Sequence, residues 1–339
     1  MSNPQVSIII ASYNGVHFLQ KCIPSVQQSE LHNIEIIVYD DNSTDTTEEY
    51  IAQQKTTDDR IVYFKNTHNL GAAKTRNNAV LHARSNLLIF LDNDTEVKQN
   101  WIDELLKCFE DPTIGAVQST LIDYHERDKI QLIGVKLIPH AFWGAPLLRG
   151  QSVEHIPPDP QQIIALSAAL AVRKEIFQKI GGFDELLAVY TEDIELSYRI
   201  WLSGFRIVNS PKSHVFHWTK KVSDRKTMHA NTQHIYFHLA KNTIRSIIKN
   251  YSSQNIILYM PFSLIILSGR AIVKLFYNDP SAIIGTAKGL WWNIVKLPKT
   301  LQERKKIRAM VEVKSEHLIN QKVFTSESLL QIYHNYFRS

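Results

Sequence analysis

The sequence predicts an α/β fold in which helices cover both faces of a mostly parallel sheet, followed by a C-terminal helical extension. Apolar runs alternate with segments of helical spacing over about the first 100 residues, an order typical of parallel sheets. These runs lack polar–apolar alternation, as expected for strands buried on both faces. Polar clusters follow three of them, at the strand ends where such sheets bind ligands.

The first strand is predicted at 6–15, and the apolar residues of 17–29 follow it at helical spacing. A second strand at 34–39 leads through an acidic turn into a helix, where Asp45 and Glu48 have the spacing of a capping box. A third strand, "RIVYFKN", precedes a loop and a helix, "NLGAAKTRNNAVLHA". The fourth strand, "LLIFLDND", ends on two carboxylates.

The middle of the chain, roughly 112–165, is predicted to be irregular because it holds six prolines. Loops, short strands and a mobile flap are expected there. Order resumes in "IIALSAALAVRKEIFQKIGGFDE", read as a strand and then a helix that Gly181 and Gly182 end. Another helix is predicted from about Glu192 to Ser203, with a strand after it.

Charge is distributed unevenly along the chain. Residues 1–240 contain 23 basic and 28 acidic residues, a net charge of −5, whereas 241–339 contain 15 Lys/Arg and 5 Asp/Glu, a net charge of +10. A basic tail indicates an anionic partner, either a membrane or nucleic acid. Its aromatic residues lie among aliphatic ones rather than in a polar groove, so no nucleic-acid partner is expected.

The basic tail has two interpretations. Its apolar run at 255–269 is shorter than the roughly 20 residues that span a bilayer, but Trp291 and Trp292 beside lysines suit helices that lie in the membrane interface. The basic segment 304–308 supports the same interpretation. The alternative is a helical subdomain that packs on the preceding α/β domain or on a second subunit.

Several classes of protein are disfavoured by what the sequence lacks. Cys22 and Cys108 give neither a disulfide framework nor zinc spacing, which suits a reducing cytosol. The N-terminal segment reads as a strand rather than a secretory leader, so a cytoplasmic location is expected. No GxGxxG follows the first strand and no GxxxxGK[ST] occurs, which argues against dinucleotide and P-loop sites.

Asp92 and Asp94 follow the fourth strand directly. Alternate carboxylates at a strand end can share a hard divalent cation together with a diphosphate, although a polar turn is the simpler explanation. His214 and His217 lie further along the chain in "SHVFHWTKK". In a strand their spacing places them on opposite faces, so at most one could bind a metal beside Asp94.

Two further acidic pairs lie at element ends. Asp40 and Asp41 could cap the following helix, but one acid suffices for that, which leaves the pair without a partner. Glu192 and Asp193 begin a helix, whose dipole stabilises acids; a general base is the functional alternative. Arg76 could bind phosphate oxygens or form a surface salt bridge.

Taken in order, the segments resemble the family-2 glycosyltransferases of the GT-A fold. The resemblance extends over about 1–220, and the ordered set is much more specific than any single segment. From about Lys241 the chain is similar, more loosely, to the tails of bacterial members that build cell-surface glycans, including rhamnosyl-type transferases. The segments of 1–220 that carry the resemblance to the family are "VSIIIASYNG", "IIVYDDNSTDTT", "NLGAAKTRNNAV", "LLIFLDNDTEV", "ALSAALAVRKEIFQKIGGFDE", "YTEDIELSYRIWLSGFRIV" and "HVFH".

The resemblance implies a domain organisation and a set of site residues. A catalytic domain at 1–240 would comprise a nucleotide-binding half at about 1–110 and an acceptor half at about 111–240, before a basic, amphipathic helical region at 241–339. Asp193 would be the catalytic base, and Glu192 would position the acceptor or orient the base, whereas His214 receives no role. The implied nucleotide-binding residues are Ala11, Ser12, Tyr13, Asn14, Asp41, Arg76 and Asp92. The implied metal-binding residues are Asp94 as the direct ligand, Asp92 and His217, with Mn²⁺ or Mg²⁺ as the ion.

The implied activity is inverting transfer of a hexosyl or deoxyhexosyl group from a nucleoside-diphosphate sugar to a hydroxyl group. The acceptor would be a polyprenol-linked or surface glycan, at the cytoplasmic face of the cell membrane. A nucleotidyltransferase or another nucleotide-sugar enzyme remains an alternative, as does a non-catalytic nucleotide-sugar-binding or scaffold protein. A homo-oligomer is also compatible with the sequence.

Overall fold

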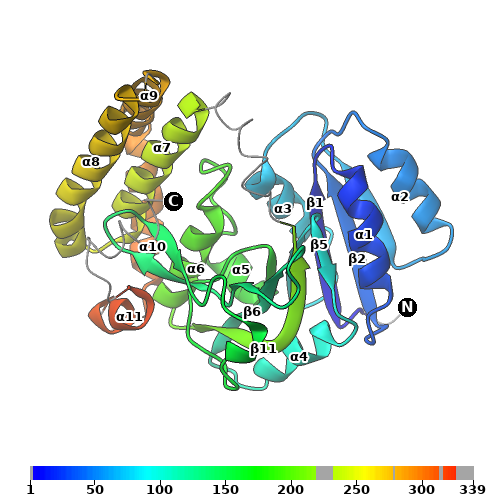
Figure 1. The fold of residues 1–339 in the computed structure, drawn as a ribbon. Helices are drawn as coiled ribbons and strands as arrows, with labels where there is room; N and C mark the ends of the chain where they lie inside the picture. The colour runs from blue at the N-terminus through cyan, green and yellow to red at the C-terminus, as the bar shows by residue number, and fades with distance from the viewer. Residues whose placement is uncertain (1–2, 219–231, 278, 313–315, 326–339) are drawn as a thin grey trace.

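The computed structural model describes residues 3–218, 232–277, 279–312 and 316–325, which form an α/β domain flanked by a group of helices (Figure 1). The described residues build a nine-stranded sheet of order β3-β2-β1-β4-β10-β6-β11-β5, with β7 paired to β6. A separate two-stranded sheet joins β8 to β9. The strands are β1 (Val6–Ser12), β2 (Ile34–Asp40), β3 (Ile61–Lys65), β4 (Leu87–Asp92), β5 (Thr95–Val97), β6 (Ile114–Asp123), β7 (Ile130–Leu132), β8 (Val135–Ile138), β9 (Trp143–Pro146), β10 (Ala169–Arg173) and β11 (Arg206–His217).

The N-terminal part of the sheet follows the sequence prediction. β1 pairs in parallel with both β2 and β4, and β2 pairs in parallel with β3. The intervening helices are α1 (Val16–Gln27), α2 (Thr47–Lys55) and α3 (Ala72–Val80). The capping box predicted for Asp45 and Glu48 does not form. Asp45 accepts hydrogen bonds from Thr47, and the Glu48 carboxylate instead pairs with Lys65 at 2.8 Å.

The second half of the sheet is more regular than its sequence indicated. The region expected to be irregular contains β6, a buried ten-residue strand that pairs in parallel with β11. Gln118, Ser119 and Thr120 lie in the middle of β6, are fully buried and obscure its apolar pattern. They are tolerated because each makes a buried hydrogen bond, for example Gln118 Oε1 accepting from the Leu166 N–H at 2.6 Å. β10 is antiparallel to both of its neighbours, so the sheet is mixed but mostly parallel.

Helices cover both faces of the sheet, as predicted. One apolar core lies against α1, α2 and α4 (Trp101–Cys108), and the other lies against α3, α5 (Lys174–Lys179) and α6 (Glu192–Leu202). Successive residues of β4 alternate between the two cores, with Phe90 in one and Leu91 in the other. Gly181 and Gly182 follow α5 with positive φ angles of 86° and 66°, which end the helix as expected.

The C-terminal helices are α7 (Thr232–Asn250), α8 (Ser253–Leu275), α9 (Ser281–Val295), α10 (Leu297–Met310) and α11 (Glu316–Val323). Ile247 of α7 and Ile307 of α10 belong to the same apolar core as α6, so these two helices pack on the catalytic half. The predicted domain boundary at residue 240 lies inside α7. The packed-subdomain interpretation therefore describes α7 and α10.

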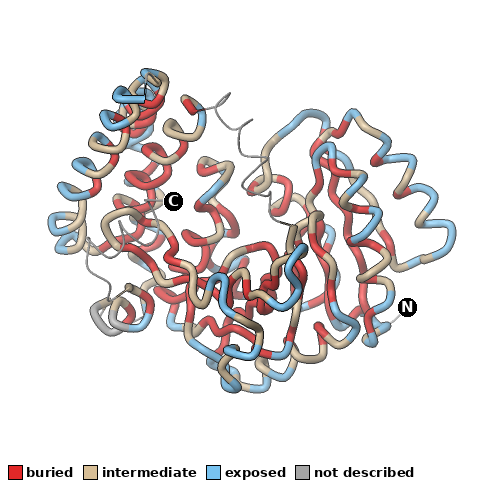
Figure 2. The backbone as a smooth tube through the Cα atoms, in the orientation of Figure 1, coloured by how far each residue is buried: buried red, intermediate tan, exposed pale blue. Residues whose placement is uncertain are grey.

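Helices α8 and α9 instead expose many large apolar side chains. Figure 2 shows much of the backbone of these helices as exposed or intermediate. Within the part of the chain that the structure describes, α8 is the one helix whose length and composition would allow it to cross a membrane. It has 23 residues, of which the apolar run at 255–269 is a part, and it continues past Arg270 and Lys274. A narrow buried stripe of Ser263, Leu267 and Ala271 faces the protein.

Two glycines allow α9 to approach α7 closely. A Cβ atom at Gly285 would lie 2.3 Å from the Gln233 carbonyl oxygen, and one at Gly289 would lie 2.6 Å from the Phe237 carbonyl oxygen. Both contacts are with helix backbone, which cannot move aside as a flexible side chain can. Asn293, one turn further along α9, donates to the Lys241 carbonyl at 3.1 Å.

We expect Gly289→Ala to lower the melting temperature, because the added methyl group forces the two helices apart. Gly269→Ala in α8 is the matched control, since a Cβ there meets no atom within 4 Å. Alanine favours helix by about 1 kcal/mol over glycine, so the control should be neutral or stabilising. Thermal unfolding of both variants tests the packing; equal effects would contradict it.

Candidate active site

Asp92, Asp94 and His217 meet at the end of β4. Each offers one ligand atom, and these atoms all lie within 4.8 Å of one another. The short strand β5 pairs with β11 so that Thr95 lies opposite His217, which brings the preceding Asp94 to the histidine. Asp94 Oδ1 is 3.3 Å from His217 Nε2. The register of β5 on β11 therefore builds a cluster that the sequence had predicted from two distant motifs.

The ring of His217 is oriented for cation binding, although a cation must displace the proton that Asp94 favours on Nε2. Its Nδ1 lies 2.8 Å from Gln131 Oε1, so an N–H on Nδ1 donates to that amide oxygen and leaves Nε2 directed at Asp94. Burial lowers the pKa of His217, but the hydrogen bond and charge of Asp94, with Asp92, outweigh it and raise the pKa above its ordinary value. The site attracts positive charge, and two carboxylates with an imidazole nitrogen fit a divalent cation.

Arg76 links this cluster to the start of α6. Its guanidinium lies 2.6 Å from Asp92 Oδ1 and 3.1 Å from Glu192 Oε1, and the residue is 7% exposed. The ring of Phe183 lies 5.6 Å from the guanidinium carbon on another side. Arg76 is thus a buried bridge between two carboxylates and not a surface salt bridge.

Glu192 and Asp193 occupy the first turn of α6, and their two environments differ. Glu192 is buried, and its Oε2 has no hydrogen-bond partner among the described residues. Asp193 accepts from the Ser167 N–H at 3.2 Å and from the Ile194 N–H at 2.7 Å. Burial and the charge of Glu192 raise the pKa of Asp193 to about 7. Burial likewise raises the pKa of Glu192, although Arg76 opposes it.

The acids at the end of β2 have partners that the sequence did not reveal. Asp41 accepts hydrogen bonds from Asn66 Nδ2, the Leu70 N–H and the Gly71 N–H, each at 2.8 Å. Gly71 has φ +82, a conformation that favours glycine. The expectation that capping leaves this pair without a partner is wrong, because Asp41 shapes the loop that begins α3.

Asp40 has a different role from its neighbour. It is fully buried, and its Oδ1 accepts from the Ser43 N–H at 2.9 Å while Tyr63 donates its hydroxyl to Oδ2 at 2.8 Å. These bonds fix the turn after β2. Because both oxygens of Asp40 are used there, Asp41 is the acid of the pair that remains a candidate for nucleotide binding.

The end of β1 lies between Asp41 and the metal cluster. Ser12 is buried; its carbonyl accepts from the Asp41 N–H at 2.8 Å, and its hydroxyl accepts from Asn93 Nδ2 at 2.9 Å. Asn14, with φ +48, accepts from the Thr44 N–H at 2.8 Å. Tyr13 is 50% exposed and Ala11 is partly exposed. Ser12 is thus fixed in the interior, while Tyr13 and, in part, Ala11 remain exposed.

The other histidines lie outside this cluster. His214 contacts Lys98 and the Pro211 carbonyl, so the prediction that only one histidine of the pair joins Asp94 is confirmed. The rings of His234 and His238 contact each other on α7, tilted at 52° with 4.4 Å between centroids, and His229 lies outside the described residues.

Comparison with known proteins defines the family. A model described as glycosyl transferase family 2 matches residues 7–180, just over half of the chain. The chain therefore belongs to glycosyl transferase family 2. It is 29% identical over 222 residues to the O-antigen biosynthesis protein RfbC of Myxococcus xanthus, which covers 63% of this chain and 17% of that protein.

A second relative and a similar solved structure are also glycosyltransferases by name. The GalNAc(5)-diNAcBac-PP-undecaprenol beta-1,3-glucosyltransferase of Campylobacter jejuni is 34% identical over 105 residues, 31% of this chain and 34% of that enzyme. The chain thus spans only about a third or less of either relative. The mannosyltransferase PcManGT from Pyrobaculum calidifontis, solved with GDP-Man and Mn²⁺, has a TM-score of 0.56 at 18% identity, covering 91% of this chain and 86% of that one. The predicted GT-A fold is confirmed.

Sequence reasoning missed four residues that complete the site: Gln131, Ser167, Asn66 and Phe183. Gln131 holds His217, Ser167 holds Asp193, Asn66 holds Asp41, and Phe183 packs on Arg76. Each lies in a loop or short strand and acts through one contact made only in the folded chain. Ser167 and Phe183 lie in a segment that carries the family resemblance, but nothing in that segment predicts their contacts, and Gln131 and Asn66 lie outside the segments that carry it.

Removing the Asp94 carboxylate tests the metal cluster directly. We expect Asp94→Ala to weaken Mn²⁺-dependent binding of a nucleoside diphosphate at least about tenfold, because it removes an oxygen ligand and the carboxylate nearest His217. His214→Ala is the control and should bind as the unchanged protein does. Calorimetric titration with and without EDTA measures this; Mn²⁺-dependent binding that survives in Asp94→Ala would refute the assignment.

Proposed function

We propose that the chain is an inverting, metal-dependent glycosyltransferase. It would move a hexosyl or deoxyhexosyl group from a nucleoside-diphosphate sugar to a hydroxyl group of a polyprenol-linked or surface glycan. The observation that carries this proposal is the connected set of Asp94, Asp92, Arg76, Glu192 and Asp193, which joins a cation site to a high-pKa carboxylate within one site.

The donor nucleotide would lie along the ends of β1 and β2. Asp41 retains accepting capacity beside its three N–H contacts, so it can accept a further hydrogen bond from a base. Ala11, Tyr13 and Asn14 present the exposed edge that would contact base and ribose. The mannosyltransferase structure with GDP-Man and Mn²⁺ supports a nucleotide sugar and a divalent ion as the ligands of this fold.

The diphosphate would lie beside Arg76, Asp92, Asp94 and His217. A divalent cation, Mn²⁺ or Mg²⁺, held by Asp94, Asp92 and His217 would neutralise the negative charge that develops on the leaving diphosphate. Arg76 contributes a fixed positive charge to the same region without a proton transfer. Its bond to Asp92 also fixes the orientation of that carboxylate.

Asp193 would take the proton from the acceptor hydroxyl. A base with a pKa near the working pH combines sufficient ionisation with sufficient proton affinity, and the pKa of Asp193 is about 7. The Ser167 and Ile194 N–H groups hold its two oxygens in place. One base opposite the leaving group gives a single displacement and inverts the anomeric carbon. Glu192, tied to Arg76, would orient the acceptor or the base.

The direct test is transfer or hydrolysis measured against a panel of nucleotide sugars, including rhamnose, galactose and glucose donors. Asp193→Asn should lower kcat at least about 100-fold, the low end for loss of a general base, with donor affinity nearly unchanged. The unchanged protein should lose activity as pH falls through about 7, because Asp193 then becomes protonated.

A nucleotidyltransferase or a binding protein would behave differently in this assay. Either would retain its nucleotide chemistry or affinity in Asp193→Asn and would transfer no sugar. Full transfer activity in that variant would refute the role of Asp193, and an affinity loss without a kcat loss would reassign it to donor binding.

We also infer that the α8–α9 surface contacts the inner face of the cell membrane, where a polyprenol-linked acceptor would be presented. Exposed apolar side chains cover it, among them Ile257 at 77%, Ile265 at 67% and Trp291 at 64%. An apolar surface of this size on a soluble chain marks an interaction site. The net charge of +10 in 241–339 favours an anionic lipid surface. The Campylobacter relative, by its name, acts on an undecaprenol-linked substrate.

Replacing Ile257, Ile265 and Trp291 by serine should weaken binding to phosphatidylglycerol vesicles at least about tenfold, because the buried apolar area is lost. Leu81→Ser is the control, since Leu81 is 80% exposed at the end of α3. Co-sedimentation at low and high salt measures the effect. A triple variant that binds vesicles normally but changes oligomeric state would assign the surface to a second copy of the chain.

A further inference from the structure

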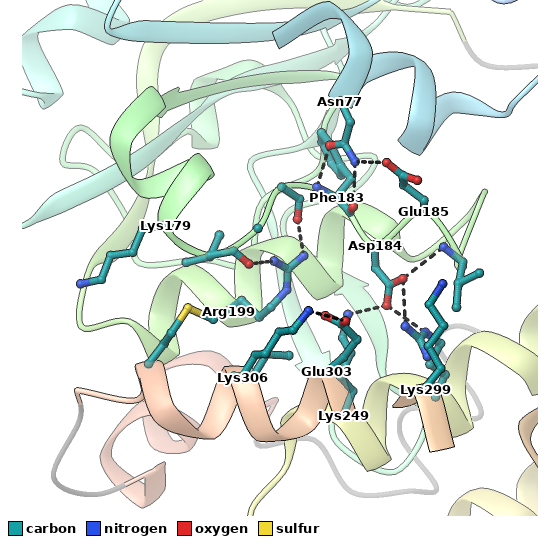
Figure 3. Close-up of a pocket in the computed structure, with 17 residues that line it drawn as sticks. Asn77, Lys179, Phe183, Asp184, Glu185, Arg199, Lys249, Lys299, Glu303 and Lys306 are labelled. Carbon is teal, nitrogen blue, oxygen red and sulfur yellow. Dashed lines mark hydrogen bonds and ion pairs between the residues drawn. The ribbon is translucent and has the colours of Figure 1, made fainter. Parts of the chain in front are cut away.

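A cavity of about 370 Å³ lies behind α6, away from the residues of the candidate active site. Figure 3 shows it between the loop around Phe183 and Asp184 on one side and α10 on the other, with α7 closing one end. Phe183 separates it from Arg76, whose guanidinium lies on that ring. The cavity is therefore a second concave site that shares a wall with the first.

Among the buried side chains at the cavity and those they contact, positive charges outnumber negative charges. Arg199, Arg245 and Lys249 line it and are 4%, 1% and 3% exposed. The buried carboxylates that they contact are Asp184 and Glu195. Three buried positive charges are thus paired with two buried negative charges.

A fourth buried cation, Lys241, lies nearby but does not line the cavity. Its ammonium donates to the carbonyls of Leu186 and Leu187 at 2.8 Å and 3.1 Å, and burial lowers its pKa to about 8. The excess of positive charge at the cavity therefore comes from the lining residues themselves, and an uncompensated buried charge gives such a site affinity for an anion.

The rim adds further positive charge. Glu185 and Glu303 are already paired, with Lys74 at 2.8 Å and Lys306 at 2.9 Å. Lys299 lines the cavity on the first turn of α10 and makes no ion pair among the residues that the structure describes. Its ammonium is available to a ligand.

We propose that this cavity binds a phosphate or diphosphate group carried by a molecule that also has an apolar portion. A doubly charged phosphate compensates the buried excess, and Lys299 and Lys306 supply charge-assisted hydrogen bonds at the entrance. The volume exceeds that of a phosphate alone, and Ile180, Ile307 and Met310 give it an apolar wall. The proposal does not depend on the sugar-transfer reaction.

Binding in this cavity would act on the catalytic helix. Arg199 bonds to Glu195 one turn along α6 at 2.7 Å, and α6 begins with Glu192 and Asp193. A ligand that fills the cavity would tighten the contact of α6 with α7 and α10. The phosphate group could belong to a soluble metabolite or to a membrane lipid, and the experiment separates the two.

The test compares two double variants of equal charge change in the full chain. Lys299→Glu with Lys306→Glu alters the cavity rim, whereas Lys288→Glu with Lys305→Glu alters exposed lysines outside it. Inorganic pyrophosphate is titrated by calorimetry in EDTA, so that the cation site cannot contribute. Phosphatidylglycerol vesicles are titrated separately, against phosphatidylcholine vesicles.

We expect the rim variant to bind pyrophosphate at least about tenfold more weakly, and the control variant to bind unchanged. An effect seen only with phosphatidylglycerol vesicles would identify a lipid as the source of the phosphate. Equal losses in both double variants would show bulk electrostatics and overturn the proposal. So would an absence of binding by the unchanged chain, or pyrophosphate binding that Asp94→Ala removes and the rim variant keeps.

Discussion

The guanidinium of Arg76 is the contact on which the arrangement of the site depends. It joins Asp92, at the end of β4, to Glu192, at the start of α6. A buried arginine requires compensation, and neither carboxylate alone would balance it as well as the pair does. The end of β4 and the start of α6 are thus held together by charge as well as by packing. The Asp92–Asp94–His217 cluster lies at one end of this bridge, and Asp193 follows Glu192 at the other.

The same bridge separates the properties of two neighbouring acids. Arg76 bonds directly to Glu192 and only influences Asp193 from a greater distance, so the positive charge is shared unequally. Asp193 is left partly buried beside a negative neighbour, and its pKa reaches about 7. Two adjacent acids at a helix start therefore have different surroundings, one ion-paired and one with a pKa of about 7. The difference arises from the position of one arginine, which is 116 residues away in sequence from its partner.

What could be predicted from the sequence was whatever had a local signal. The non-alternating apolar runs of β1, β2 and β4 predicted strands buried on both faces. Asp92 and Asp94 indicated a candidate cation site because both carboxylates lie within three consecutive residues. Strand β6 was missed because Gln118, Ser119 and Thr120 are polar, and only their tertiary hydrogen bonds make burial tolerable. Likewise, Gln131 and Ser167 function through contacts that no spacing encodes. The close approach of α7 and α9 at two glycines is a property of pairs of helices, which a single helix pattern does not contain.

The ion pairs between helix α7 and Asp184 constrain how the C-terminal helices can be exchanged between related proteins. Helix α7 begins among residues assigned to the catalytic domain and continues without a break into the C-terminal helices, and its Arg245 and Lys249 bind Asp184, nine residues before Asp193. A recombination event at residue 240 would separate these cations from the carboxylate that they neutralise. Exchange of tails between family members would therefore have to carry the loop at 180–191 along with the helices. In this chain the loop at 180–191 and helix α7 would have to change together, because their buried charges neutralise each other.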